Sequence, residues 1–179
     1  LHLSVAAGIR TDSIGRWVGT DRVVRCMPNT PALVGQGMTA LYPCPSVSTA
    51  DKALVEQVIG TTGQYLWVAQ ESQLDAVTAL SGSGPAYVFY LIEELTKTAE
   101  QLGFNQDEAE LLVQETFLGA SLLLEASGKT PAELRQQVTS PNGTTMRAIA
   151  ELEKADLTEL FNRATEAALL RAKEIARGQ

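Results

Sequence analysis

The sequence predicts a small α/β sheet over residues 1–70, followed by an all-helical part over residues 71–179. Two observations support this fold class. Up to about residue 70, short apolar runs bounded by glycine and proline alternate with helical patterns, as in α/β proteins. Beyond that point the strand signals cease, and apolar residues recur with helical spacing to the end of the chain. The change in periodicity predicts a domain boundary near residues 69–72.

Apolar runs predict strands in the first part, at residues 1–7, 21–27, 38–41 and 64–68. A short helix is expected at residues 11–18. A longer one is expected after Ser48, because Ser48 and Asp51 have the spacing of a capping box. The first strand begins at Leu1 with no initiator methionine before it, so we expect the sequence to be a piece of a longer protein.

The second part is expected to contain only helices. The first covers residues 71–80 and is interrupted by the glycine-rich run 81–84, after which Pro85 takes the favoured first position of a long helix. N-cap residue types stand directly before three further apolar stripes, at Asn105, Thr130 and Asp156. The helix after Asn105 is apolar on two faces, which predicts that a partner subunit covers one of them.

Composition and charge narrow the classes of function. The 179 residues are 45% hydrophobic, as in a globular protein, and the net charge of −7 disfavours nucleic acid or an anionic membrane surface as the main partner. No apolar run approaches the ~18 residues of a membrane span, and a cytoplasmic location is expected. Cys26, Cys44 and His2 lack metal-ligand spacing, so we predict neither a metal site nor Cys-His catalysis.

A turn of small polar residues, Ser-Pro-Asn-Gly-Thr-Thr at 140–145, leads into a helical pattern. Asn142 and Gly143 tolerate φ > 0, and Thr144 or Thr145 is expected as the N-cap. Free backbone N–H groups and the helix dipole at such a start favour a carboxylate or phosphate by ~0.3–2 kcal/mol. From its local pattern, the turn is either a plain helix start or an anion site.

Three motifs rich in glycine, proline and hydroxyl groups follow one another along the chain. They are Met-Pro-Asn-Thr-Pro at 27–31, Ser-Gly-Ser-Gly-Pro-Ala-Tyr at 81–87 and the turn at 140–145. In this order and at these separations they resemble pyrroline-5-carboxylate reductase, over nearly the whole chain. The resemblance implies that residues 1–70 are the C-terminal part of a Rossmann-type NAD(P)-binding domain. No G-x-G-x-x-G phosphate turn matches in these residues. The rest is then a helical domain that binds substrate and dimerises, with dimers that often assemble further.

The same resemblance implies the reaction and its site residues. NADPH or NADH supplies a hydride that reduces the cyclic imine 1-pyrroline-5-carboxylate to L-proline, the last step of proline biosynthesis. The Ser140 hydroxyl and the N–H groups around Gly143 and Thr144 would hold the substrate carboxylate. Thr145, as the catalytic residue, would hydrogen-bond the ring nitrogen, orienting the substrate or relaying a proton. Asn142 stands where the family usually has glycine, and its amide is a further candidate substrate contact.

Two loops are expected to border the cofactor. Ala7 and Gly8 follow the first predicted strand, and in open α/β sheets ligands bind beyond the carboxyl ends of the strands. The resemblance places a second loop beside the nicotinamide, formed by Met27, Pro28, Asn29 and Thr30. From local pattern alone, this second loop is a proline-rich strand end.

The sequence also allows two other functions. The chain by itself could be a dimerisation module without catalysis, since it lacks the phosphate turn, and we expect the isolated fragment to be inactive. It could also belong to another dehydrogenase with a helical domain, of the β-hydroxyacid type. Those enzymes generally use a lysine from the helical domain, and Lys97 lies away from every glycine loop, which disfavours this alternative.

Overall fold

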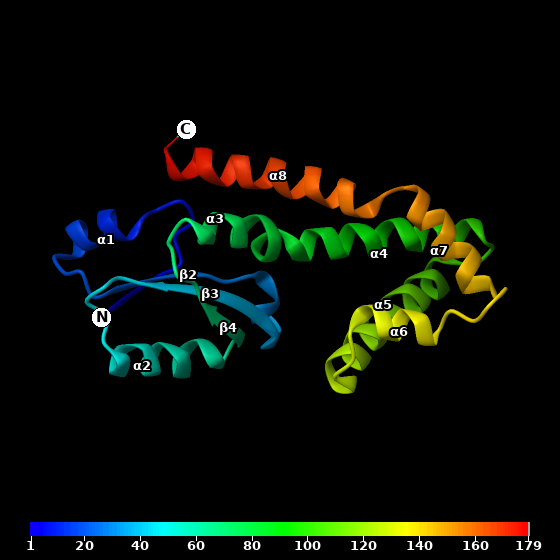
Figure 1. Cartoon of the computed structure of the whole chain (residues 1–179), viewed down its shortest axis with the longest axis horizontal. Helices are drawn as coiled ribbons and strands as arrows, with labels where there is room; N and C mark the ends of the chain where they lie inside the picture. Colours follow the sequence, from blue (N-terminus) through cyan, green and yellow to red (C-terminus); the bar gives the residue numbers. More distant parts are fainter. Residues whose placement is uncertain (179) are drawn as a thin grey trace. The chain divides into compact units, whose positions relative to one another are not determined.

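A computed structural model describes residues 1–178 of the chain (Figure 1). The chain folds into two compact units. Residues 1–86 form the first together with residues from Asn162 onward, and residues 87–161 form the second.

The first unit is built on a four-stranded mixed sheet with strand order β1-β2-β3-β4. Its strands are β1 (His2–Ser4), β2 (Val23–Met27), β3 (Gly37–Pro43) and β4 (Gly63–Trp67). β1 is parallel to β2 and β3 is parallel to β4, whereas β2 and β3 run antiparallel. The predicted α/β sheet is therefore confirmed. The first strand is shorter than predicted: its backbone leaves the sheet after Ser4, and Gly8 turns it with φ 75°.

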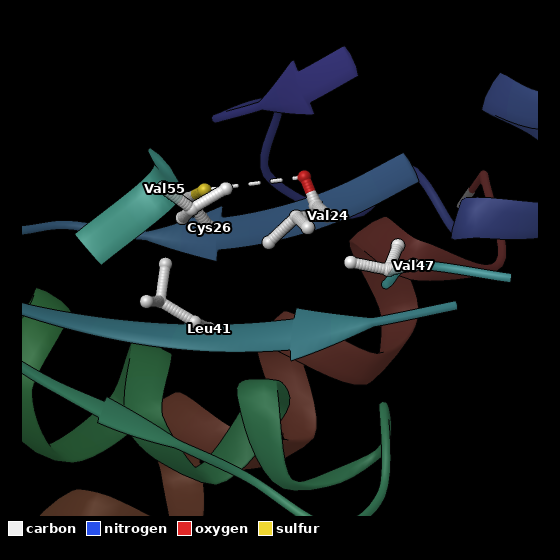
Figure 2. Packing of buried hydrophobic residues seen from close by; sticks show 5 residues of the cluster. All are labelled: Val24, Cys26, Leu41, Val47 and Val55. Carbon is white, nitrogen blue, oxygen red and sulfur yellow. Dashed lines mark hydrogen bonds between the residues drawn. The ribbon is translucent and has the colours of Figure 1, made fainter. Parts of the chain in front are cut away.

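Helices cover both faces of this sheet, as Figure 1 shows for α2 (Thr49–Gly60) and α3 (Gln73–Val77). On the α2 face, one buried cluster joins the two central strands to the helix and consists of Val24, Cys26, Leu41, Val47 and Val55 (Figure 2). On the other face, Leu74 of α3 packs with Ala40 and Val68. α1 (Thr11–Val18) lies next to β2 and has the bounds that the sequence predicts.

The capping box at the start of α2 forms as predicted. Ser48 Oγ accepts the Asp51 N–H at 3.1 Å, and Asp51 Oδ2 accepts the Ser48 N–H at 3.1 Å. Asp51 also binds Arg22, whose Nη2 lies 2.6 Å from Asp51 Oδ1. The hydrogen bond from Arg22, followed by the one from the Ser48 backbone, holds the pKa of the Asp51 carboxyl well below its usual range.

The run 81–84 does not form the predicted break between helices. α3 passes instead into a π-helical turn at Thr78–Gly82, closed by the Ser83 N–H donating to the Thr78 carbonyl at 2.8 Å, and α4 (Gly84–Gln101) follows directly. The glycines and serines of this run adopt helical backbone angles, and the wider turn keeps the backbone hydrogen-bonded. The predicted four-residue break is therefore wrong in extent, because only Ser83 lies outside both helical segments.

The second unit is all-helical. It contains most of α4, all of α5 (Gln106–Ser127), α6 (Pro131–Gln137) and α7 (Thr144–Lys154), and the start of α8 (Leu157–Ala176). The predicted N-caps at Asn105 and Thr130 are confirmed and each forms a capping box, and Asp156 Oδ1 accepts the Glu159 N–H at 3.2 Å as the predicted cap of α8.

The core of the second unit is small. Ala99, Ala109 and Val113 are buried, and Ile92 and Phe117 pack against them. α5 leaves large apolar side chains exposed, namely Leu111, Leu112, Leu118, Leu122, Leu123 and Leu124. The second apolar face that the sequence predicts for this helix is therefore uncovered in the single chain. Among the residues described, no helix is both long and apolar enough to cross a bilayer.

Candidate functional site

The loops after β1 and β2 lie at the same edge of the sheet. The two strands are parallel neighbours, with Leu3 beside Val24 and Ser4 beside Arg25, so their carboxyl ends meet. Ala7 and Gly8 follow the first strand, and Pro28 follows the second. Ligands of open α/β sheets bind at such an edge, which agrees with the position predicted for the two cofactor loops.

Gly8 occupies a position that no other residue fits without strain. Its φ of 75° lies in the left-handed region, and a Cβ built on it would lie 2.9 Å from Ile175 Cγ2 of α8. The backbone of the first loop therefore packs directly against this helix. Ala7, beside it, is exposed.

In the second loop, Asn29 is held from two sides through its side-chain amide. Its Oδ1 accepts the Met38 N–H at 2.9 Å, and its Nδ2 donates to the Ser81 carbonyl at 3.2 Å and to Ser81 Oγ at 3.4 Å. Thr30 is exposed and begins a short 3₁₀ helix, Thr30–Val34, with proline in its first turn. Two of the three sequence motifs, at 27–31 and 81–87, are thus brought into contact.

Met27 makes a second contact between these motifs. A Cβ built on Gly82 would lie 2.9 Å from Met27 Cε, so the missing side chain at Gly82 makes room for the methionine methyl group. Met27 and Pro28 are half-buried. The loop after β2 and the π-helical turn before α4 fit together at both Met27 and Asn29.

A buried carboxylate that the sequence did not predict fixes the start of α1. Glu71 Oε1 accepts the Thr11 N–H at 2.8 Å, and Glu71 Oε2 accepts the Thr11 hydroxyl at 2.9 Å. Arg25 Nη1 lies 3.2 Å from Oε1, and the side chains of Arg25 and Glu71 are only 5% and 9% exposed. The exposed Arg10 adds a longer contact of 3.7 Å. Because α1 begins three residues after Gly8, Glu71 anchors the end of the first candidate cofactor loop.

The turn at 140–145 lies in the second unit and opens α7. Asn142 adopts the left-handed conformation that its residue type allows, with φ 60°, and the Gly143 N–H donates to the Ser140 carbonyl at 3.0 Å. A Cβ on Gly143 would lie 2.5 Å from Ser140 Oγ, so the serine hydroxyl occupies the space above the glycine. Glycine is required here by this close approach rather than by φ, which is −80°.

The predicted N-cap of α7 was wrong by one or two residues. Gly143, in extended conformation, is the N-cap, whereas Thr144 and Thr145 are the first two residues of the helix. No side chain caps the helix among the described residues, so the first N–H groups of α7 lack the hydroxyl acceptor that a Ser or Thr cap would provide. Thr144 is exposed and Thr145 is half-buried in this first turn.

The described residues offer neither a reactive thiol in Cys26 nor a metal-binding group of side chains. Cys26 lies in the core of the sheet, where burial raises the pKa of its thiol to about 11. Within residues 1–178, no three His, Cys, Asp or Glu side chains are grouped so that they could hold a metal ion. The polar groups of these segments are backbone groups, hydroxyls and one amide. Such groups can bind and orient a ligand.

Comparison with known proteins gives a consistent result. The family model for pyrroline-5-carboxylate reductase dimerisation matches residues 71–175. Pyrroline-5-carboxylate reductase of Pseudomonas aeruginosa is 46% identical over 177 residues, which are 98% of this chain and 65% of that protein. The Glycine max enzyme of the same name is 40% identical over 98% of this chain and 64% of its own length. The chain thus spans slightly less than two thirds of these relatives.

Solved structures of two similar proteins have the same fold. A pyrroline-5-carboxylate reductase from Coxiella burnetii superposes with a TM-score of 0.93 at 45% identity, over 96% of this chain and 64% of that one. Plasmodium falciparum pyrroline carboxylate reductase, solved with NADP bound, superposes with a TM-score of 0.85 at 30% identity, over 97% of this chain and 70% of that one.

Proposed function

The chain belongs to the pyrroline-5-carboxylate reductase family, and we propose that it is the part of such a reductase that holds the substrate and borders the nicotinamide. In this proposal residues 1–70 are the end of a Rossmann-type domain, and residues 71–179 are the substrate-binding and dimerisation domain. The reaction is reduction of 1-pyrroline-5-carboxylate to L-proline. The observation that carries the proposal is the family likeness over 98% of the chain at 46% identity.

The turn at 140–145 is suited to hold the substrate carboxylate. The uncapped N–H groups at the start of α7 and the positive end of the helix dipole attract an anion. Ser140 Oγ lies beside Gly143, where it can donate a further hydrogen bond to the same anion. Asn142 keeps the turn closed in place of glycine and presents its amide as a further substrate contact. Thr144 contributes its backbone N–H.

Thr145 is proposed to hydrogen-bond the ring nitrogen of the imine. Its hydroxyl lies in the first turn of α7, next to the N–H groups proposed for the carboxylate. Carboxylate and ring nitrogen are the two fixed polar groups of the substrate, and holding both orients the imine carbon. A threonine hydroxyl is too weak an acid to be the sole proton donor, so its main task is orientation.

The residues at the edge of the sheet fit a nicotinamide cofactor, NADPH or NADH. Ala7 and Gly8 follow β1, Met27 ends β2, and Pro28, Asn29 and Thr30 follow it. None of these residues is charged, and they lie at or beyond the carboxyl ends of two parallel strands. The bound cofactor would supply the hydride. These chain segments would position it and exclude water.

Reductase activity can be tested with two preparations. One is the 179-residue chain, and the other is a chimera that places the part of the Pseudomonas aeruginosa relative lying before the matched region in front of this chain. We expect the chimera to oxidise NADPH when pyrroline-5-carboxylate is added and the chain alone to be inactive. Thr145→Ala in the chimera should cost about 1–3 kcal/mol of transition-state stabilisation, measured as a lower kcat/KM. Thr165→Ala on α8 should leave kcat/KM unchanged. An inactive chimera that is folded and binds NADPH would contradict the proposal.

A second candidate function for the 179-residue chain by itself is dimerisation without catalysis. A groove of about 820 Å³ between α4 and α5 is lined by apolar side chains, such as Phe89 and Leu118, together with polar and charged ones, such as Glu110. Together with the exposed leucines of α5, it supports a homodimer formed through the helical unit, with higher assembly open. Light scattering should give twice the chain mass, and Leu118→Glu should give the mass of one chain. Turnover by the 179-residue chain alone would rule out the non-catalytic alternative.

A β-hydroxyacid dehydrogenase receives no support from the helical unit. Lys97 Nζ lies 2.7 Å from carboxylate oxygens of both Glu93 and Glu94, and the lysine side chain is 52% exposed. Hydrogen bonds from Glu93 and Glu94 raise the pKa of Lys97 above its usual value, which keeps the amine protonated. A lysine engaged in this way on the helix surface is unsuited to orient a substrate.

A further inference from the structure

We propose that Asn29 is a positioning residue: its amide fastens the loop after β2 to the π-helical turn before α4, and so sets the position of Met27. The proposal rests on the proposed function for the role of this loop beside the nicotinamide. It gives Asn29 a different task from the direct cofactor contact that the family resemblance implies.

The hydrogen bonds of Asn29 determine which way its amide points. The oxygen faces a donor, the Met38 N–H at 2.9 Å, and the nitrogen faces an acceptor, the Ser81 carbonyl at 3.2 Å. Rotating the amide by half a turn would set oxygen against oxygen and nitrogen against N–H. The amide thus joins the start of β3 to a turn that lies 52 residues after Asn29 in the chain. Both of its ends are engaged with protein groups.

The Ser81 carbonyl needs a donor because of the residue four positions later. In an α-helix this carbonyl would accept the N–H of residue 85, which is a proline and has none. The turn at Thr78–Gly82 is instead π-helical, closed by the bond from Ser83 N–H to the Thr78 carbonyl. Asn29 supplies the donor that Pro85 lacks. π-helical turns are rare and often occur at functional sites.

Met27 is held by the same arrangement. Its terminal methyl group occupies the space that a Cβ on Gly82 would need, at 2.9 Å. If the Asn29 contact to Ser81 is lost, the turn can move and the surface that supports Met27 moves with it. Asn29 therefore acts on the loop through the turn and needs no contact with the cofactor.

The variant Asn29→Asp separates the two ends of the amide. An aspartate oxygen still accepts the Met38 N–H, while its second oxygen faces the Ser81 carbonyl and is repelled by it. Asn105→Asp is the matched control, because Asn105 Oδ1 accepts the Glu108 N–H at the cap of α5 and an aspartate does the same.

Hydrogen exchange in the 179-residue chain tests the fastening by itself. We expect exchange at the Ser83 N–H to be at least tenfold faster in Asn29→Asp, with the Met38 N–H changed less than threefold, and neither changed in Asn105→Asp. Ser81→Ala removes only the longer contact, at 3.4 Å, and should shift Ser83 exchange in the same direction by a smaller factor. Adding Pro85→Ala to Asn29→Asp restores a donor at residue 85 and should slow the exchange again. Unchanged exchange in Asn29→Asp and Ser81→Ala would overturn the proposal, even if the reductase proved active.

Kinetics of the chimera separate positioning from direct contact. A positioning role predicts that Asn29→Asp lowers kcat at least tenfold and changes the KM for NADPH less than threefold. A raised KM for NADPH with unchanged kcat would instead assign Asn29 to the cofactor and overturn the proposal. If the parent chimera has no activity, the proposed function fails, and the exchange measurements still decide whether Asn29 fastens the turn.

Discussion

The buried pair of Glu71 and Arg25 offers a direct test of what holds the first candidate cofactor loop. Glu71→Ala removes the acceptor for three hydrogen bonds, from the Thr11 N–H at 2.8 Å, the Thr11 hydroxyl at 2.9 Å and Arg25 Nη1 at 3.2 Å. It also leaves the Arg25 guanidinium, 5% exposed, without its main counter-charge. Removing one partner of a buried ion pair costs about 3–5 kcal/mol. For a chain of this length, that corresponds to a fall in Tm of about 6–20 °C.

The double replacement Glu71→Leu with Arg25→Met tests the cause of the stability lost in Glu71→Ala. The loss can come from the buried Arg25 charge, left without its partner, or from lost packing. Replacing both partners by apolar residues of similar volume is often close to neutral, so the double variant should recover the part of the loss that comes from the unpaired Arg25 charge. The Thr11 N–H and hydroxyl still lack their acceptor in this variant. Glu93→Ala, which removes an exposed partner of Lys97, is the control and should leave unfolding nearly unchanged. Urea unfolding followed by circular dichroism measures all three variants. A loss below about 1 kcal/mol for Glu71→Ala, or a double variant no more stable than it, would refute the reasoning.

Three further predictions follow from single groups. The depressed pKa of Asp51 means that its carboxylate stabilises the fold above about pH 4 and loses this effect as the pH falls. The Tm difference between parent and Asp51→Asn should therefore be constant from pH 5 to 7 and shrink below about pH 4; a difference independent of pH would contradict this. At pH 8.5, a disulfide reagent should label the half-buried Cys44 quickly and Cys26, with its pKa near 11, slowly. If the Cys44→Ser variant were still labelled quickly, Cys26 and not Cys44 would be the fast-reacting thiol. Gly143→Ala should displace the Ser140 hydroxyl and raise the KM of the chimera for pyrroline-5-carboxylate several-fold with little change in the KM for NADPH, and unchanged values for both would exclude that hydroxyl from the substrate site.

Local signals account for the elements that were predicted correctly. The N-caps at Ser48, Asn105 and Thr130 each act over three residues, so they can be read directly from the chain, and each forms as expected. The left-handed Asn142 is a property of its own residue type. The strands were located by apolar runs, but an apolar run carries no direction, and the antiparallel pairing of β2 with β3 could not be predicted from it.

Errors arose where two local signals competed. Thr144 and Thr145 are good N-cap types, yet the cap is Gly143, where the Ser140 hydroxyl occupies the space that a Cβ would need. The run of glycine and serine at 81–84 has the composition of a loop. It is nevertheless largely helical, and Asn29, far away in the sequence, donates to the Ser81 carbonyl, for which Pro85 has no N–H.

The sequence by itself determined the fold class, most helix starts and the family, since these depend on residue types and spacings within a few positions or on motifs in a fixed order. Only the tertiary structure showed that Glu71 binds Thr11 across 60 residues and that Asn29 binds Ser81 across 52. Such pairings depend on which strands become neighbours and on which face each helix lies. Sheet topology decides both, and no local pattern in the chain encodes it.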